Sequence, residues 1–199
     1  VLNAADLAIP SAIAITGDNG HDLTVLLDAE AEQVVLSGPS LSVGPIQLTL
    51  NFAGILNDRL RGFYRSTLVL DGEEHTIATT QFQSTDARRA FPCFDEPDLK
   101  ATFAISLVVK SGLLAISNGS EISRTAIGDG TDRVVFAETI PLSTYLVAFV
   151  VGPLHATEPI EVDGVPVRII HSPGKADQTA FALEVATHSL RWLAEWYGI

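Results

Sequence analysis

The sequence predicts a mainly β fold, an antiparallel sandwich or a large curved sheet, followed by one C-terminal α-helix. From residue 1 to about residue 170 the dominant hydrophobic period is two, which is typical of strands with one buried face. Pairs of turn-forming residues interrupt the apolar runs of this region. After residue 172 the apolar residues recur at three and four, which indicates an amphipathic helix.

Four hairpins are predicted from Asn-Gly and Asp-Gly pairs, because these residues tolerate the positive φ angles of two-residue turns. The turn pairs are Asn19-Gly20, Asp71-Gly72, Asp129-Gly130 and Asp163-Gly164. The strands that they join are Ala12–Ile15 with Leu23–Leu27, Thr67–Leu70 with His75–Thr80, Ser120–Ala126 with Arg133–Thr139, and Pro159–Val162 with Val167–Ile170.

Further strands are expected at Gln33–Leu36, Ile46–Phe52, Ala101–Val109 and Thr144–Val151. About ten or more strands are too many for one small sheet, which favours a sandwich or a curved sheet. The helix is expected over Ala176–Tyr197. Because two tryptophans on a terminal helix would expose a large apolar face, we interpret residues 173–199 as the opening helix of a following domain.

The composition limits the classes of partner. Of the 199 residues, 24 are acidic and 12 are basic, which gives a net charge of −12. No positive field is available to attract phosphate groups, so nucleic acid and anionic membranes are not expected partners. The longest apolar run, residues 145–154, is too short to span a bilayer.

No catalytic or metal-binding motif is found in the chain. The five histidines are scattered without the spacing of metal ligands, and the sequence has no Gly-x-Ser-x-Gly elbow. Cys93, the one cysteine, lies between Pro92 and Phe94 and is interpreted as a small buried apolar residue.

One segment, residues 79–97, is richer in polar residues than a β fold requires. On a strand, Gln81 and Gln83 point to one face and Phe82 to the other. Two neutral amides at a strand end suit recognition of a peptide amine or carbonyl, because each amide can donate and accept hydrogen bonds. A rigid loop between two hairpins is the structural alternative.

The rest of this segment suggests a structural role. Ser84 or Thr85 is expected to cap a helical turn that contains Asp86. Four charged side chains are expected to form an ion-paired knot that two prolines close: Arg88, Arg89, Asp95 and Glu96.

The same segment resembles the longest N-terminal signature of the zinc aminopeptidases of the aminopeptidase N type, the gluzincins. It reads Thr-Gln-Phe-Gln-Ser-Thr-Asp-Ala-Arg-Arg-Ala-Phe-Pro-Cys-Phe-Asp-Glu-Pro. Similar stretches occur in order on either side, so the resemblance covers nearly the whole chain. They are Leu2-Asn3-Ala4 with Leu7, Leu56-Asn57 through Gly62-Phe63-Tyr64-Arg65-Ser66, Ala115-Ile116-Ser117-Asn118, and Leu142 through Phe149, with Leu142 in place of the family's usual Met.

The resemblance implies a saddle-shaped β domain over residues 1–172 that lacks the family's first strands. Residues 173–199 would open a thermolysin-like catalytic domain, which would hold the zinc ion and the catalytic residues outside this chain. The parent enzyme would remove single residues from peptide N-termini, and we expect it to be cytoplasmic. The expected partners of the chain are the catalytic domain and the peptide N-terminus.

Two residues can be matched with functional positions of the family. Gln81 matches a glutamine that lines the first specificity pocket, and Gln83 matches the Glu or Gln that contacts the free α-amine of the substrate. Many members have Glu at the second position. A neutral Gln83 would therefore bind the ammonium group by a hydrogen bond rather than by an ion pair.

Two other functions remain open from the residues alone. A non-catalytic relative could retain the saddle and act as a protein-interaction scaffold after losing the zinc ligands. An independent β-sandwich that binds sugars or peptides is the third hypothesis, although the expected turns offer no aromatic platform.

Overall fold

A computed structural model describes residues 1–17, 19–38 and 43–199 and confirms a mainly β fold with one C-terminal α-helix. The strands are β1 (Leu2–Asn3), β2 (Leu7–Thr16), β3 (Asn19–Asp22), β4 (Thr24–Asp28), β5 (Gln33–Ser37), β6 (Gln47–Gly54), β7 (Gly62–Leu70), β8 (Glu73–Gln81), β9 (Ser106–Lys110), β10 (Leu114–Ser117), β11 (Glu121–Gly128), β12 (Thr131–Phe136), β13 (Phe149–Gly152), β14 (His155–Ala156), β15 (Ile160–Val162), β16 (Val165–Val167) and β17 (Ile170–His171). The helices are the 3₁₀ turns η1 (Ala87–Arg89), η2 (Thr144–Leu146) and η3 (Ala176–Gln178), and α1 (Ala180–Tyr197).

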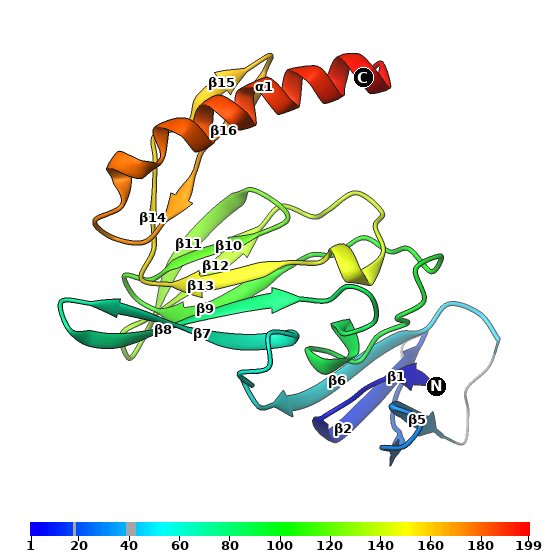
Figure 1. Ribbon diagram of the computed structural model, residues 1–199. Helices are drawn as coiled ribbons and strands as arrows, with labels where there is room; N and C mark the ends of the chain where they lie inside the picture. The colour runs from blue at the N-terminus through cyan, green and yellow to red at the C-terminus, as the bar shows by residue number, and fades with distance from the viewer. Residues whose placement is uncertain (18, 39–42) are drawn as a thin grey trace.

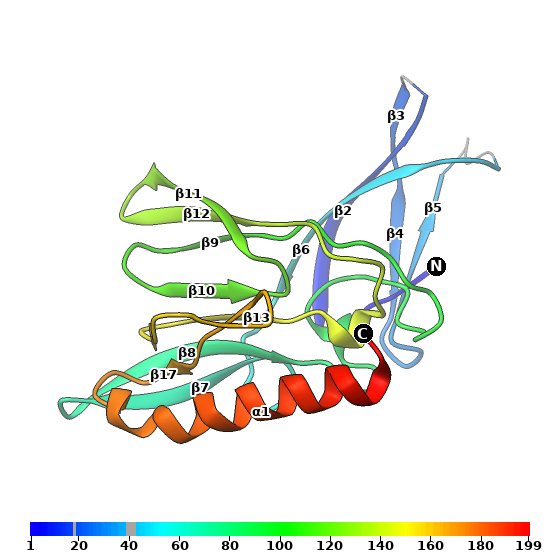
Figure 2. The ribbon, with the colours of Figure 1, turned by 90° about the horizontal axis from the view of Figure 1, so that it is seen from above.

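The strands pair antiparallel in small sheets. The N-terminal part contains the sheets β1-β5-β4 and β3-β2-β6. The centre contains β10-β13-β8-β7 and β11-β12-β9, and two-stranded pairs β14-β17 and β15-β16 lead to α1. Figures 1 and 2 show the N-terminal strands in blue and cyan at one side of the central sheets, and α1 in red at another side.

Three of the predicted hairpin turns are confirmed. Asp71, Asp129 and Asp163 each have a φ of 51°, and the glycine that follows each also has a positive φ. Each pair connects two strands that are hydrogen-bonded to each other. The local turn chemistry is therefore sufficient to place these three reversals of the chain.

The predicted Asn19-Gly20 hairpin is wrong in both its turn and its second strand, because β2 pairs with β3, whereas β4 (Thr24–Asp28) pairs with β5. Asn19 pairs with Thr16, so the connection lies two residues earlier and Asn19 and Gly20 belong to β3. Gly17 has a φ of +62° and supplies the left-handed conformation. Asp18, the second residue of the connection, lies outside the described residues.

Two predicted strands are shorter in the structure. Residues 102–105 precede β9 as extended chain outside any assigned strand, although Ala101 forms an isolated bridge with Leu142. Thr144 begins the 3₁₀ turn η2, and the strand β13 starts only at Phe149. Both shortened strands pack against the segment of residues 79–97. Next to this segment the chain does not continue the hydrogen-bonded strand pairing.

A hydrophobic cluster, the aromatic core, lies beneath that segment, and its fully buried members are Phe82, Ala87, Cys93 and Val147. Several half-buried aromatic residues pack against it, among them Phe91, Phe103 and Phe149. The β1-β5 and β2 strands and the β9-β12 pair have apolar clusters of their own.

The helix α1 ends at Tyr197 and is capped by Gly198, which adopts the left-handed conformation at a φ of 69° and donates its N–H to the carbonyls of Ala194 and Glu195. It contacts β15 and β16, and Arg191 forms an ion pair with Asp163 at 3.1 Å. Trp192 and Trp196 stack at 5.5 Å and are 52% and 70% exposed. No helix in the described ranges is long and apolar enough to cross a membrane.

Candidate functional site

The two glutamines flank one buried aromatic residue, as the strand periodicity predicts. Gln81 is the last residue of β8 and pairs with Gly62, whereas Gln83 follows in a turn. Both glutamines are exposed, and Phe82 between them is only 2% exposed. The Gln83–Ser84 peptide bond is cis. The two carboxamides are therefore available to a ligand on the surface of the domain.

Phe82 fixes the backbone from which both glutamines project. Its ring meets Phe91 and Phe149 edge to face, with centroid distances of 5.9 and 6.1 Å. The carbonyl of Phe82 also accepts a hydrogen bond from the Asp86 N–H at 2.8 Å. An aromatic anchor and a closed turn thus hold the backbone on both sides of Phe82.

The predicted cap of the helical turn is wrong in detail. The turn η1 begins at Ala87, so Asp86 precedes it, and no side chain caps it. The carboxylate of Asp86 instead accepts a hydrogen bond from Arg89 Nε at 2.8 Å. Asp86 forms an ion pair and not a cap because the guanidinium of Arg89, which has several N–H donors, lies three residues further along the chain.

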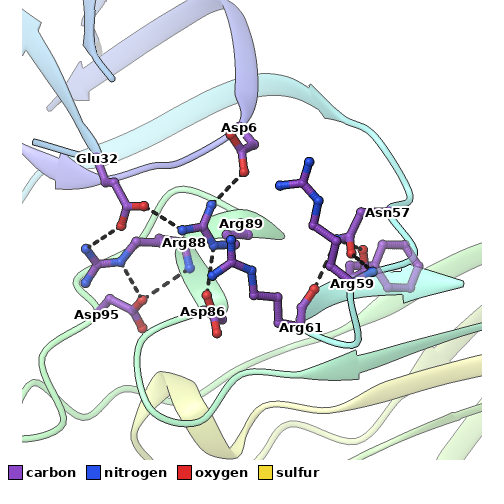
Figure 3. A network of polar contacts seen from close by, with 10 residues as sticks. Asp6, Glu32, Asn57, Arg59, Arg61, Asp86, Arg88, Arg89 and Asp95 are labelled. Carbon is purple, nitrogen blue, oxygen red and sulfur yellow. Dashed lines mark hydrogen bonds and ion pairs between the residues drawn. The ribbon is translucent and has the colours of Figure 1, made fainter. Parts of the chain in front are cut away.

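The predicted ion-paired knot is present with a different set of acids (Figure 3). Arg88 Nε lies 3.0 Å from Asp95, and Arg89 pairs with Asp86, as expected for neighbours in the sequence. Glu32 accepts from both arginines, at 3.4 Å from Arg88 and 2.5 Å from Arg89. The knot therefore ties the N-terminal strands to the segment that carries the glutamines.

Asp6 completes the network, with a 2.6 Å contact to Arg89. Glu96, which was expected in the knot, is exposed and forms no ion pair with the residues that the structure describes. Sequence reasoning missed Asp6 and Glu32 because they are 83 and 57 residues away from Arg89. Within the local sequence, no signal separates these two acids from the other carboxylates of an acidic chain.

Asp95 is the most deeply buried member of the network, at 2% exposure. Its carboxylate accepts hydrogen bonds from the Arg88 N–H at 3.3 Å and from the Thr144 hydroxyl at 2.6 Å, beside the Arg88 Nε contact. Its own N–H donates to Asn3 Oδ1 at 3.1 Å. A buried carboxylate is tolerated here because its oxygens are paired with donors.

The protonation of the surrounding groups follows from burial and charge. Burial lowers the pKa of Arg89, but the hydrogen bond that Arg89 donates to Asp86 and the charges of Glu32 and Asp6 outweigh it, so the net shift is upward. Burial raises the pKa of the Cys93 thiol to about 12, and the charge of Asp95 adds to the effect. Cys93 is therefore a protonated, buried residue, as the sequence indicated.

Gly62 allows β7 to lie against the knot. Its φ is +67°, and a Cβ atom at this position would lie 2.9 Å from the Cβ of Arg89. Because Gly62 pairs with Gln81, a side chain here would displace either Arg89 or the end of β8. This contact couples the ion-paired knot to the position of the first glutamine.

The two exposed carboxamides offer hydrogen-bond donors and acceptors without charge. Among the described residues, no group of three or more His, Cys, Asp or Glu side chains could hold a metal ion. Gln81 and Gln83 line none of four cavities in the described ranges, the first of which lies between β6, β9 and the aromatic core.

Comparison with known proteins identifies the family. Residues 1–146 match the family described as the Peptidase M1 N-terminal domain. The chain is similar over its full length to "Aminopeptidase M1" of Arabidopsis thaliana, at 42% identity, and to "Puromycin-sensitive aminopeptidase" of Caenorhabditis elegans, at 40% identity. Over 85% of its length it is 42% identical to "Alanine/arginine aminopeptidase" of Saccharomyces cerevisiae.

The chain spans about a fifth of the length of these relatives, namely 23%, 21% and 20%. The match to the family extends through the glutamine segment and the knot and ends in η2. The antiparallel β fold and the aminopeptidase relatives agree with this assignment. The chain therefore belongs to the Peptidase M1 N-terminal domain family.

Proposed function

We propose that this chain is the substrate-anchoring domain of a zinc aminopeptidase that removes single residues from peptide N-termini. The observation that carries the proposal is the exposure of Gln81 and Gln83 on either side of the anchored Phe82. The names of the relatives support an aminopeptidase. In this proposal zinc is bound elsewhere in the full-length protein, since among the described residues no group of three or more His, Cys, Asp or Glu side chains could hold a metal ion.

In this proposal each glutamine has a separate role. The carbonyl oxygen of Gln83 accepts a hydrogen bond from the α-ammonium group of the peptide, and Gln81 forms part of the wall around the first side chain. The aromatic core that contains Phe82 limits the movement of both residues. The domain thus fixes the N-terminus of the substrate, and the catalytic groups come from the rest of the protein.

Gln83→Glu tests the anchoring role. In the protein at its full encoded length, we expect the substitution to lower KM for amino-acid anilides by about 2–30-fold. A charge-assisted hydrogen bond contributes about 1.5–3 kcal/mol and a neutral one about 1 kcal/mol. Steady-state kinetics with alanine and arginine anilides at neutral pH measures the effect.

Gln178→Glu is the matched control for this experiment, because it adds the same charge at an exposed glutamine of η3 outside the proposed site and should leave KM unchanged. An unchanged KM in Gln83→Glu would contradict the contact with the amine. Complete absence of anilide hydrolysis in the unmodified full-length protein would favour the non-catalytic scaffold.

We also propose that residues 1–172 form the β domain, to which further strands of the full-length protein add. Both β6 and β9 lie at sheet edges, and residues from both line an apolar cavity of about 570 Å³. The Thr139 and Phe136 amides bond the carbonyls of Phe103 and Ile105, so the backbone groups of Ala104 and Ser106 face the opposite side. An edge strand with unpaired N–H and C=O groups can pair with a further strand, whose side chains would cover the adjoining apolar cavity.

Hydrogen exchange tests this layout. In the full-length protein, we expect the amides of Ala104 and Ser106 to exchange about 100-fold more slowly than an unprotected amide. The amide of Gly112, in the turn between β9 and β10, is the control and should exchange fast. Fast exchange at all three positions would contradict added strands, and protection that disappears on dilution would indicate pairing with a second copy instead.

Residues 173–199 are proposed to begin the catalytic domain. The helix α1 exposes Phe181, Trp192 and Trp196, a face that a packed domain would cover. For the compartment we propose the cytoplasm, with which the single, buried and free Cys93 is compatible.

A further inference from the structure

The short β14-β17 pair brings together two histidines that the sequence places far apart. His155 pairs directly with His171 in the antiparallel register, so both side chains lie on the same face. Their ring centroids are 6.0 Å apart, with an interplanar angle of 87°. His155 is exposed and His171 is half-buried. The pair is therefore open to solvent on one side and fixed to the fold on the other.

The environment of His171 selects one tautomer of its ring. Nδ1 lies 2.8 Å from the carbonyl oxygen of Ser172. A carbonyl oxygen can only accept a hydrogen bond, so Nδ1 carries the proton and the lone pair of Nε2 is free. A histidine whose second nitrogen donates to a carbonyl is the usual form of a metal-ligating imidazole.

We propose that His155 and His171 form a two-histidine site for a borderline divalent transition ion such as Ni²⁺ or Zn²⁺. Imidazole nitrogen suits these ions, and water completes the coordination at an exposed site. Ring rotation about the side-chain bonds brings both Nε2 atoms to one ion, since the two Cβ atoms of a directly opposed pair are already close.

The position of the site suggests what metal binding does. β14 follows the central strand β13 after a short connection, and β17 precedes η3 and α1. Beyond the histidines the pairing continues through Thr157, whose N–H donates to the Ile169 carbonyl at 2.9 Å and whose hydroxyl oxygen accepts from the Ile169 N–H at 3.0 Å. A bound ion would therefore clamp the exit from the central sheet to the entrance of α1. This inference does not rest on the proposed peptidase function.

Calorimetric titration with NiCl₂ tests the site in the full-length protein, after saturation with zinc and dialysis. We expect one equivalent of Ni²⁺ to bind, and binding at least about 10-fold weaker in His155→Phe and in His171→Phe. Phenylalanine retains an aromatic pair across the strands and removes the ligand nitrogen. The control, His75→Phe on β8, should bind Ni²⁺ as the unmodified protein does.

The possible outcomes distinguish a site formed by both histidines from Ni²⁺ binding elsewhere on the protein surface. Equal Ni²⁺ affinity in all four proteins would overturn the proposal, and loss in only one of the two histidine variants would show a single-histidine contact, which also overturns it. A measurement without variants is the electron paramagnetic resonance spectrum of one added equivalent of Cu²⁺. Hyperfine splitting from two nitrogens supports the pair, whereas splitting from one or none contradicts it.

Discussion

Replacing Asp95 with alanine is expected to lower the free energy of unfolding by about 3–5 kcal/mol, because it leaves the buried Arg88 guanidinium without its main partner. The side chain of Asp95 is 0% exposed and that of Arg88 is 15% exposed, so solvent screens their contact little. The Thr144 hydroxyl and the Arg88 N–H lose their acceptor as well. The loss corresponds to a Tm lower by about 6–20 °C for a domain of this size.

Glu96→Ala is the matched control for Asp95→Ala. Glu96 is the next residue, carries the same charge and is exposed, so its removal should change the stability by no more than about 0.5 kcal/mol. Thermal unfolding of the two variants in parallel separates the effect of the buried pair from that of net charge. Equal Tm values for both variants would show that Asp95 is not a structural anchor.

Replacing Phe82 with alanine is expected to lower the free energy of unfolding by about 3–5 kcal/mol, because it leaves a cavity in the aromatic core. Phe82 is 2% exposed and contacts the rings of Phe91 and Phe149. Chemical denaturation measures the loss directly. In the full-length protein, KM for anilides should also rise, because Gln81 and Gln83 lose their fixed backbone.

Phe82→Leu and Phe94→Ala are the controls for this prediction. Leucine fills most of the space, so the cost should stay below about 1.5 kcal/mol. Phe94 is 55% exposed, and its truncation should cost about 0.5 kcal/mol or less. If Phe94→Ala were as destabilising as Phe82→Ala, the assignment of Phe82 as the anchor of the glutamines would be wrong.

The alternation of Gln81, Phe82 and Gln83 shows how much of the candidate site could be predicted from the sequence. A strand period of two places Phe82 inside and both glutamines outside, and the structure agrees. The roles of the glutamines stay predictions, because the exposure of a side chain does not identify what it binds.

The hairpins show where local information ends. Asp71-Gly72, Asp129-Gly130 and Asp163-Gly164 form turns as predicted, whereas Asn19-Gly20 becomes part of β3. In the folded domain β2 also pairs with β6 along its other edge, and its Ala12 and Ala14 are only 2% and 1% exposed. These contacts of β2 with distant segments are not visible in the turn dipeptide, and they accompany a connection two residues earlier than the dipeptide predicts.

By itself the sequence determined the mainly β class, the C-terminal helix, three turns and the family, because these depend on periodicity, turn chemistry and contiguous motifs. Only the tertiary structure decided that Asp6 and Glu32 pair with Arg89, since Asp6 precedes β2, Glu32 lies in the turn before β5, and any carboxylate of this acidic chain could have served. It also placed His155 opposite His171. Contacts of this kind depend on which backbone segments meet when apolar faces are buried, and that is a property of the whole chain rather than of neighbouring residues.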